Sequence, residues 1–478
     1  MKRAIAAAML LLAAGLLPAG AQNVRVYVTS QAGDRIAEKP ALRFDEAAPP
    51  AAAFRIDDAA RLQQMDGFGA SFLEAGMICI NSLPGPAQED LLRSLFDPKT
   101  GAGFTAMKTP IACTDFMSAG PWYTYDDVPG DVELKRFSIA RDLGPNGLVT
   151  YIKRARKYGH FILQAPMDYP PDWTLFDVNS NQDVQPRYYD ALAHYYLKYA
   201  QAYAAQGIVV DYVSLFNEPM NYTKIDYDGI RELLAHYVGP LFAKAGVKTR
   251  LQLSECVGRR DTMRYYPKVL DYPDARRYVA NVPYHGYDRG NFDRVAAFHK
   301  RYPKLHLWMS ELCHAYEAGY RDPAPKLPRY DYEDGDYWGN IIFSDIEAGA
   351  SAWTYWNMIL DEDGGPWAVS PIHGNPDPNA QQPVVIVNRK THEVTYTALY
   401  YYLSHFSKFV RPGDVRVSVE GSEPGVRCLA FRAPDGGMVA EVLNSGGAPA
   451  FAALEWRGKT LPLELPARSI NTYLWDGR

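Results

Sequence analysis

Eight short apolar runs recur between residues 67 and 355, and amphipathic segments separate several of them. Helix-like segments at 186–206 and 228–245 are two examples. Strands that alternate with helices are typical of a parallel sheet, and eight such units favour a closed (β/α)8 barrel over an open sheet. The predicted strands are 67–72, 105–110, 161–166, 211–216, 251–254, 279–284, 305–310 and 350–355.

The alternative is an open, doubly wound sheet that binds a dinucleotide. Such a sheet carries a Gly-x-Gly-x-x-Gly turn after its first strand. The first run here begins Gly67-Phe68-Gly69 and does not continue in that pattern. The sequence therefore favours the closed barrel.

Both ends of the chain have a different pattern from the barrel segment. Residues 24–30 alternate in a strand-like way, and the helical period fades after about 385. Short strands separated by glycine-rich turns indicate an antiparallel sandwich. We predict N-terminal strands at 22–60 that join the sandwich, a barrel at 61–384 and the rest of the sandwich at 385–478. The strands predicted after the barrel are 384–387, 415–419, 428–432, 438–443, 450–456 and 470–474.

The first 21 residues resemble a secretory signal peptide. Lys2 and Arg3 precede an apolar run at 4–17, and Ala19-Gly20-Ala21 offers a small-residue cleavage site. The run is shorter than the ~20 residues that a membrane span needs. We therefore predict cleavage of residues 1–21 and an exported protein, periplasmic or secreted, with no transmembrane segment.

Charge and cysteine content exclude several classes of protein. A net charge of −5 and a pI near 6.1 argue against nucleic acid as a partner. Five scattered cysteines form no CxxC motif or Cys/His cluster, so we predict neither a structural metal nor a disulfide scaffold. We expect no cofactor.

Two glutamates follow predicted strands that are not neighbours. Glu218 lies in Asn217-Glu218-Pro219 after the fourth run, and Glu311 lies in Ser310-Glu311 at the end of the seventh. In parallel barrels the functional residues gather at the carboxyl ends of the strands. Retaining glycosidases need two such carboxylates, one as proton donor and acceptor and one as nucleophile. We assign these roles to Glu218 and Glu311 respectively.

Glu255, in Ser254-Glu255, is an alternative nucleophile with the same local pattern. It ends the fifth run, next to the fourth, so it should lie beside Glu218 rather than across a sugar from it. We prefer Glu311. Asn217 can donate a hydrogen bond to the sugar 2-hydroxyl, a contact that strengthens in the transition state. Burial and the charge of Glu311 are expected to raise the pKa of Glu218 towards the operating pH.

Several motifs in the same order resemble glycoside hydrolase family 30, in particular its glucosylceramidase branch. The likeness extends from about Gly67 to Trp475. It rests on the segments 67–70, 113–116, 123–127, 217–219, 310–311, 353–357, 364–366, 405–409 and 472–475. The resemblance implies a (β/α)8 barrel with a side β-sandwich, retention of anomeric configuration and no metal.

The resemblance also implies a set of sugar-binding residues. Asp115 and Trp173 match residues that bind the non-reducing sugar, Asp115 through the hydroxyls on its 4- and 6-side. Trp356 matches the floor under the same ring. His285 and Tyr287 match residues that steady the nucleophile. Core packing is the alternative role for the tryptophans and for His285.

The walls of the predicted cleft depart from the family pattern. The family's His-Trp-Tyr is His285-Gly286-Tyr287 here, and Gly-Gly-Pro-Asn ends in Trp367. The family's Ser-Pro-x-Trp begins with proline instead of serine at 170–173, and its upstream tryptophan is missing from 167–169. The reaction type is therefore better supported than the substrate.

From the sequence we predict a retaining β-glycosidase that acts on terminal β-glucosides. Its substrate is expected to be a β-linked glucoside or oligosaccharide, with a glycolipid as a further option. The alternatives within the family are an endo-β-1,6-glucanase, a β-xylosidase and a β-fucosidase. From another class, the alternative is a saccharide-binding protein without catalysis, because a fold alone does not fix a function.

Overall fold

A computed structural model describes residues 23–46, 50, 53–118, 122–177, 181–220, 225–314, 332–367 and 380–478. The predicted signal peptide at 1–21 lies outside these residues. Within the described part of the chain, no helix is both long and apolar enough to span a bilayer.

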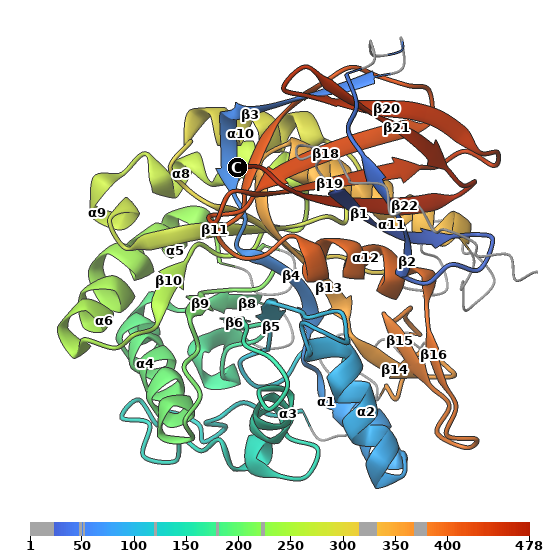
Figure 1. The fold of residues 1–478 in the computed structure, drawn as a ribbon. Coiled ribbons are helices and arrows are strands. Elements are labelled where there is room, and N and C mark those ends of the chain that lie inside the picture. The colour runs from blue at the N-terminus through green and yellow to red at the C-terminus, as the bar shows by residue number, and fades with distance from the viewer. Residues whose placement is uncertain are drawn as a thin grey trace, which may run out of the picture.

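Eight parallel strands close into a barrel in the lower half of Figure 1, and in chain order each pairs with the next. Every predicted run overlaps one of them, so the predicted barrel is confirmed. The strands are β4 (Gly67–Ser71), β5 (Ala106–Lys108), β6 (Ile162–Pro166), β9 (Tyr212–Ser214), β10 (Arg250–Gln252), β11 (Val279–His285), β12 (Leu307–Glu311) and β13 (Ala350–Asn357).

Helices and short turns connect these strands. The helices are α1 (Glu74–Ser82), α2 (Gly85–Phe96), α3 (Leu148–Ala155), α4 (Tyr189–Ala205), α5 (Tyr227–Glu232), α6 (Gly239–Ala245), α7 (Arg259–Tyr265), α8 (Pro267–Leu270), α9 (Pro273–Arg276), α10 (Phe292–Arg301), α11 (Tyr332–Glu347) and α12 (Ala398–Phe409). A π-helix, η4 (Leu233–Val238), joins α5 to α6, and 3-10 turns lie at Ala140–Leu143, Asp172–Thr174 and Pro186–Tyr188. The helical segments predicted at 186–206 and 228–245 are confirmed.

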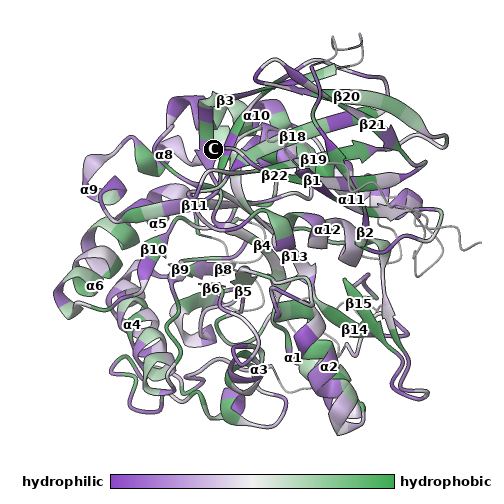
Figure 2. Cartoon of the chain, viewed as in Figure 1, coloured by the Kyte–Doolittle hydropathy of each residue, from purple (hydrophilic) through white to green (hydrophobic). Residues whose placement is uncertain are grey.

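The pattern of apolar residues explains how these elements pack. Every residue of β4, β12 and β13 is buried, as expected for strands covered on both faces. The helix α2 instead buries Leu91, Leu92, Leu95 and Phe96 along one stripe. Figure 2 shows this helix with both hydrophobic and hydrophilic colours.

The second layer is a β-sandwich built from both chain ends, as predicted. Its strands form one hydrogen-bonded sheet in the order β2-β1-β22-β19-β18-β17-β3-β20-β21. Figure 1 shows N-terminal blue strands among C-terminal red ones. The strands are β1 (Asn23–Ser30), β2 (Ala37–Arg43), β3 (Ala53–Gln64), β17 (Val415–Glu420), β18 (Val426–Arg432), β19 (Gly437–Asn444), β20 (Ala450–Trp456), β21 (Lys459–Leu465) and β22 (Ser469–Asp476).

The structure corrects the sequence analysis between 384 and 410. The strand predicted at 384–387 does not join the sandwich. It is β15 (Val385–Val387), which pairs with β14 (Ile359–Asp361) and β16 (Val394–Tyr396) in a separate small sheet. The helix α12 was not predicted because it is rich in tyrosine, a strand-favouring residue. It packs against α11 and β4, so the barrel unit extends beyond the boundary at 384.

A separate two-stranded hairpin, β7 (Leu175–Asp177) with β8 (Asn181–Val184), lies in the loop after β6.

The five cysteines are all free and buried, so no disulfide joins the two layers. The junction between barrel and sandwich depends instead on packing and on a buried polar cluster.

His405 on α12 is the centre of that cluster. Its Nδ1 lies 2.7 Å from Thr472 Oγ1 and its Nε2 lies 2.9 Å from Thr29 Oγ1. Thr472 donates to the buried carboxyl of Glu441 at 2.7 Å. Burial lowers the pKa of His405 to about 3 and raises the pKa of Glu441. The folded protein therefore holds this histidine neutral.

We expect His405 to make the protein sensitive to acid. Its folded pKa lies below its unfolded value, so between pH 6.5 and 4 only the unfolded chain takes up the proton. The free energy of unfolding should fall by about 3 kcal/mol more over this interval than in His405→Gln. The raised pKa of Glu441 has the opposite effect, because it stabilises the folded protein as the pH falls. Urea unfolding from pH 4 to 7 measures the difference.

The exposed His194 on α4 supplies the control. His194→Gln should follow the wild-type pH dependence. Parallel curves for wild type and His405→Gln would contradict the prediction.

Candidate active site

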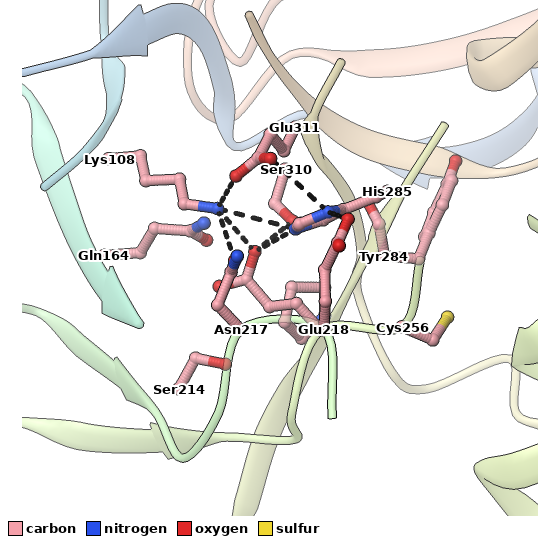
Figure 3. Close-up of polar contacts among 12 residues, drawn as sticks. Lys108, Gln164, Ser214, Asn217, Glu218, Cys256, Tyr284, His285, Ser310 and Glu311 are labelled. Carbon is pink, nitrogen blue, oxygen red and sulfur yellow. Dashed lines mark hydrogen bonds and ion pairs between the residues drawn. The ribbon is translucent and has the colours of Figure 1, made fainter. Parts of the chain in front are cut away.

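Several of the predicted site residues meet at the carboxyl end of the barrel, together with Lys108, which was not predicted. Lys108 ends β5, His285 ends β11 and Glu311 ends β12. Figure 3 shows these side chains pointing toward one another, with Asn217 and Glu218 rising from the segment after β9. The ends of parallel strands lie on one rim of a barrel, which brings these positions together although they are far apart in sequence.

Glu218 is placed by an unusual backbone. Its φ angle is +44°, in the left-handed region that non-glycine residues rarely adopt. Its amide donates to the Glu255 carbonyl at 2.9 Å, and the Glu255 amide donates to the Phe216 carbonyl at 2.9 Å. The pairing with β10 therefore continues past β9 and holds the strained residue. A strained conformation of this kind, costing on the order of 1–3 kcal/mol, is common at functional sites.

Lys108 is the cation of the cluster and is fully buried. Its ammonium group lies 2.5 Å from Glu311 Oε2, 3.0 Å from Glu255 Oε2 and 3.1 Å from Asn217 Oδ1. Burial alone would lower the pKa of Lys108, but the charges of Glu255 and Glu311 outweigh it and raise that pKa. The lysine therefore stays protonated.

Glu255 is a buried, ionised carboxylate. It is 0 % exposed, and its Oε2 accepts hydrogen bonds from Lys108 and, at 2.6 Å, from Ser310. Burial raises its pKa, but Lys108 and His285 more than reverse this and lower the pKa to about 2. Its position beside Glu218 agrees with the sequence analysis, and its complete burial leaves no surface for a sugar to reach.

His285 lies between the carboxylates. Its Nδ1 is 2.8 Å from Glu218 Oε1 and 3.6 Å from Glu311 Oε1, and its Nε2 is 3.0 Å from Glu255 Oε2. Burial lowers its pKa, but the charge of Glu311 and the contacts with Glu218 and Glu255 raise it to about 9. The imidazole thus contacts Glu218 more closely than it contacts Glu311. The family resemblance implied that this histidine steadies Glu311, the nucleophile.

Glu311 and Glu218 are close enough to act on one sugar carbon. One oxygen of each lies within 4.8 Å of the other. Tyr287 donates to Glu311 Oε1 at 3.0 Å, and burial keeps this phenol protonated by raising its pKa. A lysine and a phenol that both donate to Glu311 hold its carboxyl group in one orientation. One oriented carboxylate near a second, histidine-bound one can support nucleophilic and acid–base chemistry.

Glu218, His285 and Glu311 also have the spacing of a metal-binding triad. Their donor atoms, however, are engaged with each other and with the ammonium of Lys108 at 2.5 Å. A resident cation next to these oxygens would repel a metal ion. The donor set therefore fits an ion-pair network rather than a metal centre.

The other predicted ligands differ in what they contact. Asn217 contacts Lys108, and the ring of Trp356 lies 5.2 Å from the Lys108 ammonium, so both border the cluster. Trp173 donates its indole N–H to the Asp126 carbonyl at 2.9 Å. Asp115 is fixed through its carbonyl, which accepts from the Trp367 indole at 3.1 Å. Trp367, a departure from the family pattern, thus anchors a predicted sugar-binding loop.

Lys108 and Asp168 also belong to the site, although the sequence did not predict them. Lys108 is a lone lysine in an otherwise apolar strand, and a charge in such a position is itself a signal of a buried partner. Asp168 is 4 % exposed after β6, and burial and the nearby Asp115 and Glu311 raise its pKa. It stands in the stretch where the family's tryptophan is absent, so this wall of the site is acidic.

A buried ion pair explains Gly286. A Cβ at this position would lie 2.8 and 3.0 Å from the guanidinium nitrogens of Arg259. Arg259 cannot move aside easily, because it is fully buried and makes two 2.7 Å hydrogen bonds to Asp345. The space beside Gly286 is therefore occupied by an arginine rather than left open.

Gly286→Ala should destabilise the protein by about 1–3 kcal/mol, the usual cost of overpacking a filled core. Gly290→Ala is the matched control, because a Cβ there would meet only one atom, at 3.8 Å. It should change stability by less than about 0.5 kcal/mol. Equal unfolding midpoints for Gly286→Ala and wild type in urea would contradict the packing argument.

Comparison with known proteins agrees with the two parts of the fold. The family model for the glycosyl hydrolase family 30 TIM-barrel domain matches residues 65–410, and the model for that family's β-sandwich domain matches residues 413–473. Putative glucosylceramidase 4 of Caenorhabditis elegans is 29% identical over 89% of this chain and 83% of its own length.

Two other curated relatives have different names. Mouse lysosomal acid glucosylceramidase is 27% identical over 87% of this chain and 82% of its own. The endo-1,6-beta-D-glucanase of Neurospora crassa is 27% identical over 84% of this chain and 83% of its own. Among solved structures, SrfJ from Salmonella typhimurium superposes with a TM-score of 0.85 at 20% identity, covering 95% of this chain and all of that one.

Proposed function

Because the chain belongs to glycosyl hydrolase family 30 and is a glycoside hydrolase, we propose that it is a retaining enzyme that removes terminal β-linked glucose. Glu311 is the nucleophile and Glu218 is the acid/base in this proposal. Asn217, Asp115, Trp173 and Trp356 bind the sugar, and His285 and Tyr287 line the same site and position the two carboxylates.

The observation that carries the proposal is the distance between the two carboxylates. Oxygens of Glu218 and Glu311 within 4.8 Å of each other suit a retaining enzyme, whose carboxyl groups are about 5–5.5 Å apart. An inverting enzyme needs about 6.5–9.5 Å to place a water molecule between sugar and base. The contacts of Lys108 and Tyr287 with Glu311 orient its carboxyl group and support its role as the nucleophile.

In the first step, an oxygen of Glu311 attacks the anomeric carbon as the bond to the leaving oxygen breaks. Glu218 gives its proton to that oxygen, and a covalent glycosyl-enzyme results. In the second step, Glu218 takes a proton from water, whose oxygen displaces Glu311 with a second inversion. The Lys108 contact directs the Asn217 oxygen inward, so its amide is the group presented to the sugar 2-hydroxyl.

The sugar is proposed from the names of two relatives with equal identity. One is called a glucosylceramidase and the other an endo-1,6-beta-D-glucanase. Both names specify a glucosyl unit, which supports glucose at the position where bond cleavage occurs. The two names differ in what lies beyond that unit.

A substrate panel tests the proposal. Aryl β-glucoside, β-xyloside and β-fucoside, glucosylceramide and β-1,6-glucan should be assayed together, with proton NMR of the first anomer released. We expect the aryl β-glucoside to be hydrolysed fastest with retention. Release of internal fragments from β-1,6-glucan would favour the endo-glucanase, and binding without turnover of any substrate would favour a saccharide-binding protein.

Export is part of the same proposal. Residues 1–21 have the pattern of a cleaved signal peptide. N-terminal sequencing of protein recovered from outside the cytoplasm should begin at Gln22. An intact N-terminus on protein from the cytoplasm would contradict it.

A further inference from the structure

The hydrogen bonds of His285 require one proton whose position is shared between two groups. Each ring nitrogen faces a carboxylate oxygen, Glu218 Oε1 at 2.8 Å and Glu255 Oε2 at 3.0 Å. Ionised carboxylates only accept hydrogen bonds. Lys108 and Ser310 already donate to Glu255, so Glu255 is ionised and Nε2 carries a hydrogen. The Nδ1 contact then requires one more proton, either on Nδ1 or on Glu218.

We propose that Glu255, His285 and Glu218 form a proton relay, in which His285 shares the acid/base proton of Glu218 and Glu255 fixes the tautomer of the ring. The inference rests on the proposed function and assigns Glu255 and His285 as positioning residues. Glu255 is thereby excluded as the nucleophile and gains another role.

The relay is held rigidly. His285 is fully buried, and its backbone pairs in register with Glu311. The Glu218 amide is bonded to the Glu255 carbonyl at 2.9 Å, so the two carboxylates at either side of the ring are tied together. A carboxylate on one imidazole nitrogen determines which nitrogen faces the reacting group.

The proton balance closes over both steps. In the first, the proton shared by Glu218 and His285 moves to the glycosidic oxygen as its bond to the anomeric carbon breaks and Glu311 bonds to that carbon. The Glu218 carboxylate then faces the bare Nδ1 lone pair at short range. That repulsion makes Glu218 a stronger base for the second step. The proton taken from water restores the shared pair as the bond to Glu311 breaks.

The charges around the ring favour retention of this proton. Besides Glu218 and Glu255, His285 faces Glu311 at 3.6 Å and the Lys108 ammonium at 3.5 Å. Burial opposes protonation of the ring, but the carboxylates prevail and its pKa is raised to about 9. The ring should therefore keep its proton into mildly alkaline solution.

The pH dependence of kcat/KM tests the relay in the full chain. His285→Gln and Glu255→Gln should each move the alkaline limb of the profile down by at least one pH unit. Ser310→Ala is the matched control, because it removes a neutral hydrogen bond to Glu255 but leaves its charge. Its alkaline limb should coincide with that of the wild type. Unmoved limbs in both glutamine variants would overturn the proposal.

Leaving groups separate the relay from a structural role. In His285→Gln, aryl glucosides with poor leaving groups should lose on the order of 10²–10⁴-fold in rate, because they need the proton. Glucosides with good leaving groups should lose less than 10-fold. Equal losses for both would assign His285 to packing alone. If His285→Gln does not fold, the isosteric Glu255→Gln variant carries the same comparison.

A readout without activity keeps this test apart from that of the proposed function. Ring ¹⁵N NMR of the wild-type protein, with the resonance identified by its absence in His285→Gln, should show a ring that titrates near pH 9. In Glu218→Gln the titration should move down by at least one unit. If the wild type has no glycosidase activity but Glu218→Gln still shifts the titration, the proposed function is wrong and the proton sharing is supported. No shift would overturn the relay itself.

Discussion

Glu311→Gln is expected to lower kcat/KM for an aryl β-glucoside by on the order of 10⁴–10⁶-fold, the range seen when an enzymatic nucleophile is removed. The amide cannot form the covalent glycosyl-enzyme. Its single oxygen can accept from either Lys108 or Tyr287, which donate to different oxygens of Glu311. Folding should be retained, because the glutamine has the same shape as the glutamate and keeps one of these two hydrogen bonds. Steady-state kinetics with a thermal melt measure both effects.

A 2-fluoroglucoside with a good leaving group identifies the nucleophile directly. It should label Glu311 of the wild type, and the labelled peptide can be located by mass spectrometry. Glu420→Gln, at an exposed carboxylate of the sandwich, should have wild-type activity and labelling. A label found on Glu255 would overturn both the assignment of Glu311 and the relay.

Lys108→Met is expected to cost about 3–5 kcal/mol of folding stability, because it leaves buried carboxylates without their cation. Glu255 and Glu311 would then repel each other across the cluster, and the pKa of Glu255 should rise from about 2. Activity should fall as well, since Glu311 loses a donor at 2.5 Å. Urea unfolding at pH 5 and pH 8 measures the stability, and the loss should be greater at pH 8, where more carboxylates are ionised.

Lys135→Met is the control for removing a lysine. Lys135 forms a 2.5 Å ion pair with Glu133, but both side chains are exposed, and water replaces such a contact at little cost. Its stability should match that of the wild type. If Lys108→Met melts with the wild type too, the buried cation does not hold the site together.

The barrel could be predicted because its signal is local. Each apolar run between 67 and 355 is long enough to form one buried strand, and the segments between them carry helical periodicity. The junction after β13 could not be predicted in this way. The helix α12 contains tyrosines that favour strands, and it becomes helical because Leu399, Leu403 and Phe406 are buried together on the barrel.

The candidate site was predictable only in part. Glu218 and Glu311 each follow a strand, and strand order in a barrel brings them together without further information. The distinction between Glu311 and Glu255 is tertiary. It depends on Lys108, His285 and Ser310, which arrive from three other points of the chain and bury Glu255 completely.

The sequence by itself determined the closed barrel, the strand-end positions of the two carboxylates and the family. These follow from periodicity and short motifs, which operate over a few residues. Only the tertiary structure decided how the protons and charges are distributed. A pKa depends on burial and on charges within a few ångströms, and here those charges come from residues as far apart in sequence as Lys108 and Glu311.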